Sequence, residues 1–419
     1  MKFLKEIEFP TNLSAYSKDI FAGLTVAIVA LPLAIGFGIT SGMSAANGIV
    51  TAIVAGFIAA LFGGSNWQVS GPTGAMTVVL IPVIAKYGIT AIPILGLLSG
   101  TMVLVMALLK LGKLIKFVPS SVLEGFTVGI AIIITIQQLP YVFDVEKGSG
   151  TRTLVVAYKT LINAIDSKIH WVNIFLVAAT LLVKFNIVKI IELLKVRIYV
   201  PASFAALTLV TLISLIFNLT IPRIGNIPRA AFEFDFPHIA ITANQSNDYG
   251  LINLLIPSFT IALLIAIESL LSARVADEIK KAPKPFNPNL ELFGQGLASA
   301  AASISGGMPA TGAIARTGVN IRAGANTRIS AMAHSVFLLI IVLFGAPIFA
   351  KIPTAAIAGV LIGTSLRIFN RNTFRKVVQE GQASFAIYLV TAIATISIDL
   401  IWGIAIGTLF SFILKRVKK

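Results

Sequence analysis

The sequence predicts an all-α polytopic membrane protein, and its composition together with three long apolar segments leads to that fold class. Of its 419 residues, 57% are hydrophobic and only 12% are charged, whereas soluble globular proteins carry roughly 25% charged residues. Residues 20–40, 90–109 and 251–267 form long apolar segments. Each approaches the ~20 residues that a helix needs to cross the hydrocarbon core of a bilayer. We therefore expect lipid, rather than water, to surround most of the chain.

Apolar segments recur along the whole sequence and predict about fourteen transmembrane spans. The third and tenth are expected to be short half-helices. The spans are 20–41, 45–62, 72–87, 92–109, 119–139, 171–187, 199–217, 252–274, 291–305, 309–319, 330–348, 354–367, 381–397 and 399–415. The segments 141–170 and 218–250 are expected to be long outer loops. Residues 1–419 as a whole are expected to form a single transmembrane domain.

The positive charges predict how these spans are oriented. The formal net charge is +16, but Lys and Arg occur in short clusters between apolar segments. This is the pattern of cytoplasmic loops, and we expect no nucleic-acid partner. Clusters at 110–116, 280–284 and 367–376 all fall on the same predicted side of the membrane. An even number of spans, with both termini cytoplasmic in an inner or plasma membrane, satisfies this distribution.

Several kinds of chemistry are not expected. The chain has no cysteine, and its three histidines are scattered, so neither a thiolate nor a histidine cluster is available for a metal. No phosphate-binding loop, nucleophile elbow or zinc-protease motif occurs. We expect no enzymatic activity, no cofactor and no metal site.

A short internal repeat relates the two halves of the chain. Residues 72–75 read Pro-Thr-Gly-Ala and residues 310–313 read Ala-Thr-Gly-Ala, and each follows a glycine pair and begins a short apolar segment. Each would be the third span of a seven-span half, one at about 20–217 and the other at about 252–415. Because seven is odd, the halves would cross the membrane in opposite directions, which is the inverted repeat of many secondary transporters.

The repeated motifs have the features of helix starts. Gly71 and Gly74 allow the backbone to approach another group closely, and Pro72 suits the first turn of a helix. A helix that begins inside the membrane exposes N–H groups and the positive end of its dipole, which lipid cannot satisfy. Two such starts, with the hydroxyls of Thr73 and Thr311, would form an anion site. The alternative is that both motifs are loop-to-helix entries at the membrane surface.

An acidic residue and a basic residue lie near these motifs. Glu268 is deep in the span 252–274, where a carboxylate costs at least ~3 kcal/mol. Ser272, one turn later, shares its helix face, and both are candidates for coupling an ion to transport. Arg316 would add positive field to the second helix start. The alternatives are a static ion pair between Glu268 and Arg316, or an Arg316 that has already reached the cytoplasmic surface.

These residues resemble the SulP family of anion transporters. The resemblance is carried by Phe21-Ala-Gly-Leu-Thr, Leu31-Pro32, Phe37-Gly38, Ser70-Gly-Pro-Thr-Gly74, Ala266-Ile-Glu268-Ser-Leu-Leu and Pro309-Ala-Thr-Gly-Ala-Ile-Ala-Arg316. These stretches occur in the right order over nearly the whole chain. The resemblance implies fourteen spans in two inverted seven-span repeats, divided into a core domain and a gate domain.

The resemblance also implies where the anion binds, which is between the starts of spans three and ten. The residues on its two sides would be Thr73, Gly74, Ala75, Thr311, Gly312 and Ala313. Phe37 would border the pocket, and Glu268 would take the acidic position of span eight. Sodium-coupled bicarbonate members of the family tend to carry Asp there and lack the Arg, so sodium is less expected here than a proton or a counter-anion.

The resulting functional prediction is a secondary active transporter of a small inorganic or organic anion. Sulfate, bicarbonate and dicarboxylates all fit, and transport would proceed by alternating access, with proton symport or anion exchange. The alternatives are an anion channel and a nucleobase permease of the same fold. Family members usually carry a cytoplasmic STAS domain after the last span, and we expect none here. A homodimer is left open.

Overall fold

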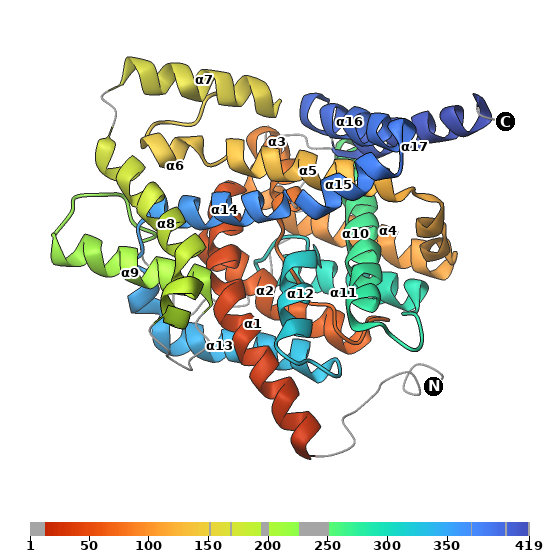
Figure 1. Cartoon of the computed structure of the whole chain (residues 1–419), viewed down its shortest axis with the longest axis horizontal. Helices are drawn as coiled ribbons and strands as arrows, with labels where there is room; N and C mark the ends of the chain where they lie inside the picture. The colour runs from red at the N-terminus through yellow and green to blue at the C-terminus, as the bar shows by residue number, and fades with distance from the viewer. Residues whose placement is uncertain are drawn as a thin grey trace. The chain divides into compact units, whose positions relative to one another are not determined.

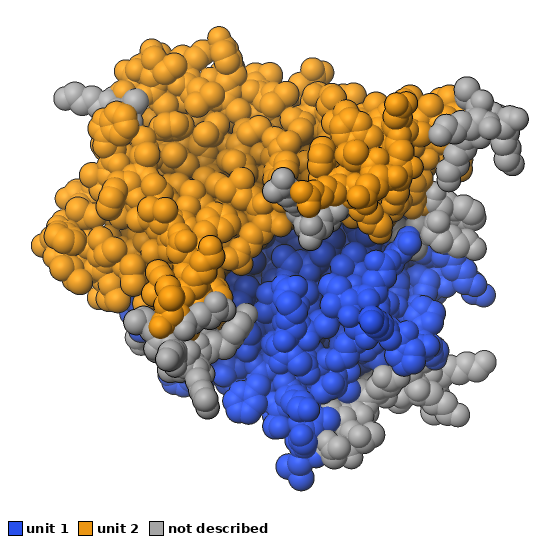
Figure 2. Space-filling view, in the orientation of Figure 1, with its two compact units in different colours: residues 1–115, 225–350 blue, residues 116–224, 351–419 orange. Residues whose placement is uncertain are grey.

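Helices make up most of the computed structural model, which describes residues 13–150, 152–167, 170–193, 201–225, 251–369, 371–398 and 400–417. The predicted helical class is therefore confirmed for the described residues. Contacts between residues divide the chain into two compact units, and each combines two segments that are distant in sequence (Figure 2). Unit 1 is Met1–Ile115 with Gly225–Ala350, and unit 2 is Lys116–Ile224 with Lys351–Lys419.

Unit 1 contains eight α-helices and two short strands among its described residues. Its helices are labelled in Figure 1. From the first segment come α1 (Leu13–Thr40), α2 (Ala45–Phe62), β1 (Ser70–Gly71), α3 (Gly74–Tyr87), the 3-10 turn η2 (Ile89–Ala91) and α4 (Ile92–Leu108). From the second come α10 (Leu251–Lys280), α11 (Pro288–Ile304), β2 (Thr311–Gly312), α12 (Ile314–Arg322) and α13 (Ile329–Phe349). A second 3-10 segment, η3 (Leu111–Phe117), follows α4.

The described residues of unit 2 form nine α-helices. Its first segment forms α5 (Ser120–Ile136), α6 (Leu139–Phe143), α7 (Thr153–Asp166), α8 (Trp171–Leu193) and α9 (Ala202–Ile216). Its second segment forms α14 (Thr354–Ile368), α15 (Arg371–Gln379), α16 (Gln382–Ser397) and α17 (Leu400–Val417).

The predicted spans coincide with helices of the structure. Each of the fourteen segments overlaps a helix, although the tenth, 309–319, does so only from Ile314 onward because β2 precedes α12. Among the described residues, seven helices are long and apolar enough to cross a membrane. Five shorter apolar helices accompany them, including α3. The helix at the tenth predicted span, α12, has nine residues, in line with the expected half-helix. The crossing of all fourteen segments stays a prediction.

The segment 141–170 differs from the long outer loop that we expected, because it contains α6 and α7. The apolar residues of α7 recur at helical spacing, at Leu154, Tyr158, Leu161 and Ile165. A helix with apolar residues on one stripe and polar residues elsewhere has too little total hydrophobicity to resemble a transmembrane span. Most of the other expected outer loop, 226–250, lies outside the described residues.

Small residues bring the helices of unit 1 close together. A side chain at Gly100 of α4 would lie 2.6 Å from the carbonyl oxygen of Gly296 on α11, and one at Gly38 of α1 would collide with the backbone of the α1–α2 connection. Helix pairs in membranes associate through such small-residue contacts, because lipid provides no hydrophobic drive to pack them. In this unit α11 packs on α2 and α4, while α1 packs on α2 and α13.

The two strands of unit 1 join its two segments. β1 pairs with β2 in antiparallel register, so that Ser70 lies opposite Gly312 and Gly71 opposite Thr311. Each strand is followed directly by a short helix, α3 after β1 and α12 after β2. This pairing brings together the two copies of the repeated motif.

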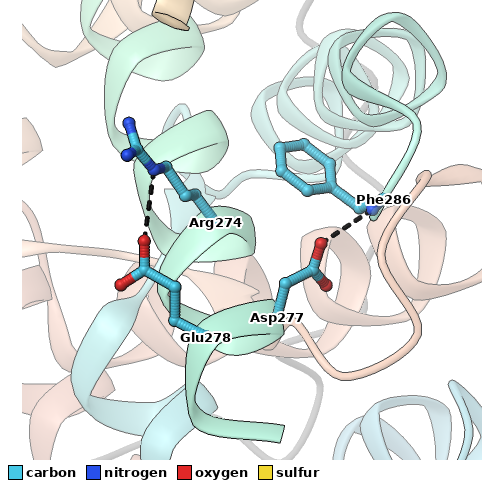
Figure 3. A network of polar contacts seen from close by, with 4 residues as sticks. All are labelled: Arg274, Asp277, Glu278 and Phe286. Atoms are coloured by element: carbon cyan, nitrogen blue, oxygen red, sulfur yellow. Dashed lines mark hydrogen bonds and ion pairs between the residues drawn. The ribbon is translucent and has the colours of Figure 1, made fainter. Parts of the chain in front are cut away.

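The end of α10 is polar and carries local contacts (Figure 3). Arg274 and Glu278 are one turn apart and lie 3.3 Å from each other, an exposed pair of the kind that contributes at most about 1 kcal/mol. The backbone N–H of Phe286 donates to the Asp277 carboxylate at 2.7 Å. This bond holds the connection between α10 and α11 against the end of α10.

Candidate functional site

The first half of the site is the start of α3. Thr73 is the N-cap residue, in an extended conformation, and its side-chain oxygen accepts a hydrogen bond from the Met76 N–H at 3.4 Å. Gly74 and Ala75 are the first two helical residues and are buried. Their N–H groups belong to the first turn, which has no acceptor within its own helix. Pro72 therefore lies just before the cap and not, as expected, in the first turn.

The second half of the site is not an exact copy of the first. Thr311 lies in β2, and α12 begins only at Ile314, with Ala313 as its N-cap. The Gly312 N–H donates to Ser269 Oγ at 3.0 Å, and the Ala313 N–H donates to the Val69 carbonyl at 2.9 Å. These bonds keep the chain extended past Thr311, so the Thr311 hydroxyl lies before the start of α12. The Thr73 hydroxyl, in contrast, caps the start of α3.

A single carboxylate connects the two halves. The hydroxyls of Thr73 and Thr311 donate to the same oxygen of Glu268, Oε2, at 2.9 and 2.7 Å. The two hydroxyl oxygens lie 3.1 Å apart. Thr311 is fully buried and Thr73 is 8% exposed, whereas Glu268 is only partly buried. One carboxylate oxygen therefore joins the start of α3 and β2 to α10.

Arg316 lies beside this carboxylate but does not pair with it. Among the described residues no ion pair within 4.0 Å joins Glu268 to Arg316, so the static pair considered above is not formed. Arg316 is 1% exposed, and its Nη2 donates to the Pro72 carbonyl at 2.8 Å. It has thus not reached the surface. Its Nη1 is buried without a hydrogen-bond partner.

Gly71 makes the approach of Arg316 to β1 feasible. Its φ of +151° is one that residues with a side chain rarely adopt. A β-carbon at this position would also lie 2.7 Å from Arg316 Nη1. Glycine is therefore required twice at this position, for the backbone conformation and for the space that the guanidinium fills.

The remaining predicted residues are nearby but make other contacts. Ser272 is buried, and its hydroxyl lies 3.2 Å from the hydroxyl of Thr317 on α12. Phe37 is in α1, and its carbonyl accepts a hydrogen bond from Thr77 of α3 at 3.5 Å. Ser272 thus links α10 to α12, and the backbone of Phe37 lies against the first turns of α3.

Several polar residues near the site were not singled out from the sequence. Ser269, which holds the Gly312 N–H, adjoins Glu268 in the sequence. Glu291 and Gln295 are buried one turn apart in α11 and bond to each other. A carboxylate and an amide at this spacing inside an apolar segment are a usable signal, because each must find a partner where water is absent.

The arrangement can hold a small anion. Two hydroxyls converge on one negatively charged oxygen, a helix start contributes N–H groups and positive dipole, and a guanidinium lies within the same cluster. Hydroxyls that donate to a carboxylate can donate equally to an oxyanion that replaces it. The described residues hold no cluster of three or more acidic, His or Cys side chains suited to a metal.

Comparison with known proteins points in the same direction. Residues 16–391 match the model of the sulfate permease family. YvdB of Bacillus subtilis (strain 168), whose name assigns it provisionally to sulfate transport, is 35% identical over 407 residues, which are 96% of this chain and 74% of YvdB.

The bicarbonate transporter BicA of Picosynechococcus (strain ATCC 27264) is 30% identical over 407 residues, covering 94% of this chain and 69% of BicA. The solved transmembrane domain of a cyanobacterial BicA superposes with a TM-score of 0.80 at 27% identity. The match covers 96% of this chain and 98% of that domain.

Proposed function

Because the chain belongs to the sulfate permease family, we propose that it is a secondary active transporter of a small anion that works by alternating access. The substrate is sulfate, bicarbonate or a dicarboxylate. The first two come from the names of its relatives, and the third rests only on the same donor chemistry. Transport proceeds by proton symport or by anion exchange.

The observation that carries this proposal is the pair of threonine hydroxyls on one oxygen of Glu268. Both hydroxyls donate to a negative charge that is attached to the protein and can move away from them. In the proposed cycle, the substrate anion replaces the Glu268 carboxylate on Thr73 and Thr311. The start of α3 then contributes the N–H groups of Gly74 and Ala75.

Protonation of Glu268 couples naturally to this exchange. An ionised carboxylate competes with the substrate for the two hydroxyls, whereas a neutral carboxyl group is a weaker acceptor and releases them more easily. A proton on Glu268 and an anion on the threonines therefore favour each other. This reciprocal preference is what a symporter requires.

For a monovalent anion, the charges of the site are balanced in both states of this cycle. Without substrate, Arg316 and an ionised Glu268 cancel each other. With a protonated Glu268 and a monovalent anion, Arg316 and the anion cancel instead. Because a net charge in a poorly solvated site is costly, one proton per monovalent anion is the favoured stoichiometry. A sodium ion in place of the proton would be repelled by the positive charge of Arg316, so sodium is not part of the proposed cycle.

We extend the proposal to architecture. Unit 1 carries every residue of the site and takes the role of the substrate-binding domain. The fourteen helices at the predicted spans form two inverted repeats, and the antiparallel pairing of β1 with β2 supports this arrangement, since each strand leads into the short helix of its own half.

Counterflow in proteoliposomes tests the proposed function. Vesicles preloaded with unlabelled sulfate, bicarbonate or a C4 dicarboxylate are exposed to trace labelled anion of the same kind. We expect saturable uptake that the matching anion inside raises transiently above the equilibrium level. A linear flux without counterflow would identify a channel, and uptake of labelled uracil without any of the anions would identify a nucleobase permease.

A further inference from the structure

Glu291 is a buried carboxylate with no place in the cycle proposed above. It lies in the first turn of α11, following the N-cap Asn287, and is 1% exposed. A negative charge is favourable there because it faces the positive end of the helix dipole. A carboxylate inside a membrane protein is costly, however, and calls for a specific reason.

The carboxylate is fully occupied by donors from one neighbouring segment and from its own helix. Its Oε2 accepts the backbone N–H groups of Gly64 and Ser65, both at 2.9 Å. Its Oε1 accepts the side-chain amides of Gln68 at 2.6 Å and Gln295 at 2.9 Å. Four donors on two oxygens suit an ionised carboxylate, which accepts only. An amide at this position would turn one of its N–H groups toward another donor.

These donors lead directly to β1. Gly64, Ser65 and Gln68 belong to the connection 63–69, which joins α2 to β1. Gln295 Nε2 also donates to the hydroxyl of Ser70, at 2.6 Å, and Ser70 is the first residue of β1. Thr73 follows three residues later. A continuous set of hydrogen bonds therefore runs from Glu291 to the strand that precedes the candidate anion site.

The same connection is held at its other end by a cation. Arg328 Nη1 donates to the carbonyls of Ala60, Leu61 and Gly63 at 3.2, 3.1 and 3.1 Å. These carbonyls end α2, where the helix leaves its last acceptors without partners. Arg328 thus fixes where α2 stops, and Glu291 fixes how the chain continues.

Close packing removes the remaining freedom of this connection. A β-carbon at Gly63 would lie 2.9 Å from Glu291 Oε2, and one at Gly64 would collide with the Asn287 carbonyl. A side chain at Gly312, the partner of Ser70 in the strand pair, would collide with the amide of Gln68. A shift of the connection would therefore disturb both strands.

From this network we infer that Glu291 is a positioning residue for anion transport. It sets the register of β1 against β2, through Gln68 and through Gln295 and Ser70. In this way it holds the hydroxyl of Thr73 within reach of the same acceptor as the hydroxyl of Thr311. It does not touch the anion. The inference rests on the proposed function for the identity of the site that is positioned, but not for the anchoring of β1.

Two substitutions and one matched control test the inference. Glu291→Gln keeps the shape of the side chain but places a donor among donors. Gln295→Met keeps the carboxylate and removes only the bridge to Ser70. The control, Asp19→Asn, alters another fully buried carboxylate of unit 1. Its donors are the Asn326 and Thr327 N–H groups and the Thr327 hydroxyl, none of which belongs to the connection 63–69 or to β1.

Three measurements are made on all variants. Two are the KM for the transported anion in counterflow and the melting temperature in detergent. The third is amide hydrogen exchange of the peptide 68–76, which does not depend on transport. For Glu291→Gln and Gln295→Met we expect faster exchange in this peptide and a KM raised about tenfold, the equivalent of one misaligned charged hydrogen bond. For Asp19→Asn we expect a lower melting temperature with wild-type KM and wild-type exchange in 68–76.

The outcomes separate the inference from the proposed function. If Glu291→Gln does not fold, Gln295→Met alone decides. Unchanged exchange in 68–76 overturns the positioning role, and so does a KM increase of the same size in Asp19→Asn. Faster exchange with unchanged KM would support the anchoring of β1 by Glu291. It would also indicate that the anion does not bind at Thr73, which counts against the proposed site.

Discussion

At the scale of single residues, the hydroxyls of Thr73 and Thr311 are the donors that the proposed site depends on most. Thr73→Val and Thr311→Val remove each hydroxyl with little change of shape. Loss of one hydrogen bond to a charged group costs roughly 1.5–3 kcal/mol, so we expect KM for the anion to rise about tenfold or more in counterflow.

Serine at the same positions provides the control for these variants, because Thr73→Ser keeps both the donor and the helix cap. Its KM should stay close to that of the wild type. If the valine variants at both positions transported with an unchanged KM, the anion would bind elsewhere.

Glu268 is the residue at which coupling can be tested. Glu268→Gln resembles the protonated acid, and its amide oxygen can still accept from both threonines. We expect counterflow to persist while an inward proton gradient no longer accelerates uptake, measured in vesicles with an imposed pH difference. Replacing external sodium with potassium should leave wild-type uptake unaltered. Strict sodium dependence, or proton coupling that survives in Glu268→Gln, would leave the carboxylate with a structural role only.

The sequence indicated some residues of the site and not others for a physical reason. Thr73, Thr311 and Glu268 were found because helix-start motifs and an intramembrane acid are local signals. The contact between them depends on the folding of segments that are far apart, and so did the burial of Arg316. Glu291 had a local signal in its one-turn spacing to Gln295, which we did not use. Its other donors, the backbone N–H groups of Gly64 and Ser65, leave no trace in residue identity.

At the scale of elements, helices could be located from the sequence but strands could not. Apolar segments about as long as a span are strong signals, and each predicted span overlaps a helix. β1 and β2 have two residues each, too few for any alternation to be visible. Their pairing gives the site its geometry, and it was indicated only indirectly, by the repeat of Thr-Gly-Ala.

Packing of α8 against α14 in unit 2 supplies a prediction about stability. Lys184 of α8 is buried, and its Nζ donates to the Val360 carbonyl and the Thr364 hydroxyl of α14, both at 2.6 Å. A β-carbon at Gly363 would lie 2.8 Å from Lys184 Cδ. We expect Gly363→Ala to lower the free energy of unfolding by roughly 1–3 kcal/mol, as overpacked cores do.

Thermal melting in detergent measures this effect. The matched control is Leu366→Ala on the same helix, because Leu366 is 45% exposed and surface substitutions usually change stability by less than about 0.5 kcal/mol. Equal melting temperatures for Gly363→Ala and the wild type would mean that α8 and α14 separate easily at this position.

At the scale of the whole molecule, composition and charge predicted the environment of the chain but not its division into units. Hydropathy reports how each segment interacts with lipid, and it carries no information about which segments pack together. Each unit combines segments separated by more than a hundred residues. Such contacts are specified by small residues such as Gly100 and Gly296, whose meaning appears only once the partner helix is known.

The orientation of the chain in the membrane can be tested directly, because the sequence contains no cysteine. Single cysteines can therefore be introduced without a background, at exposed positions of the described chain. The positive-inside rule predicts that Lys113→Cys and Lys281→Cys face the cytoplasm and that Lys159→Cys of α7 faces outward. A membrane-impermeant thiol reagent should label only the last in intact cells, and all three after lysis.

Tags on the two termini complete the orientation test, because an even number of spans places both in the cytoplasm. An inverted repeat of two odd halves requires that even number. A terminus outside the cell, or Lys113→Cys and Lys281→Cys on opposite sides, would give the halves the same orientation. In that case an inverted repeat could not explain why β1 and β2, which lead into α3 and α12, pair in antiparallel register.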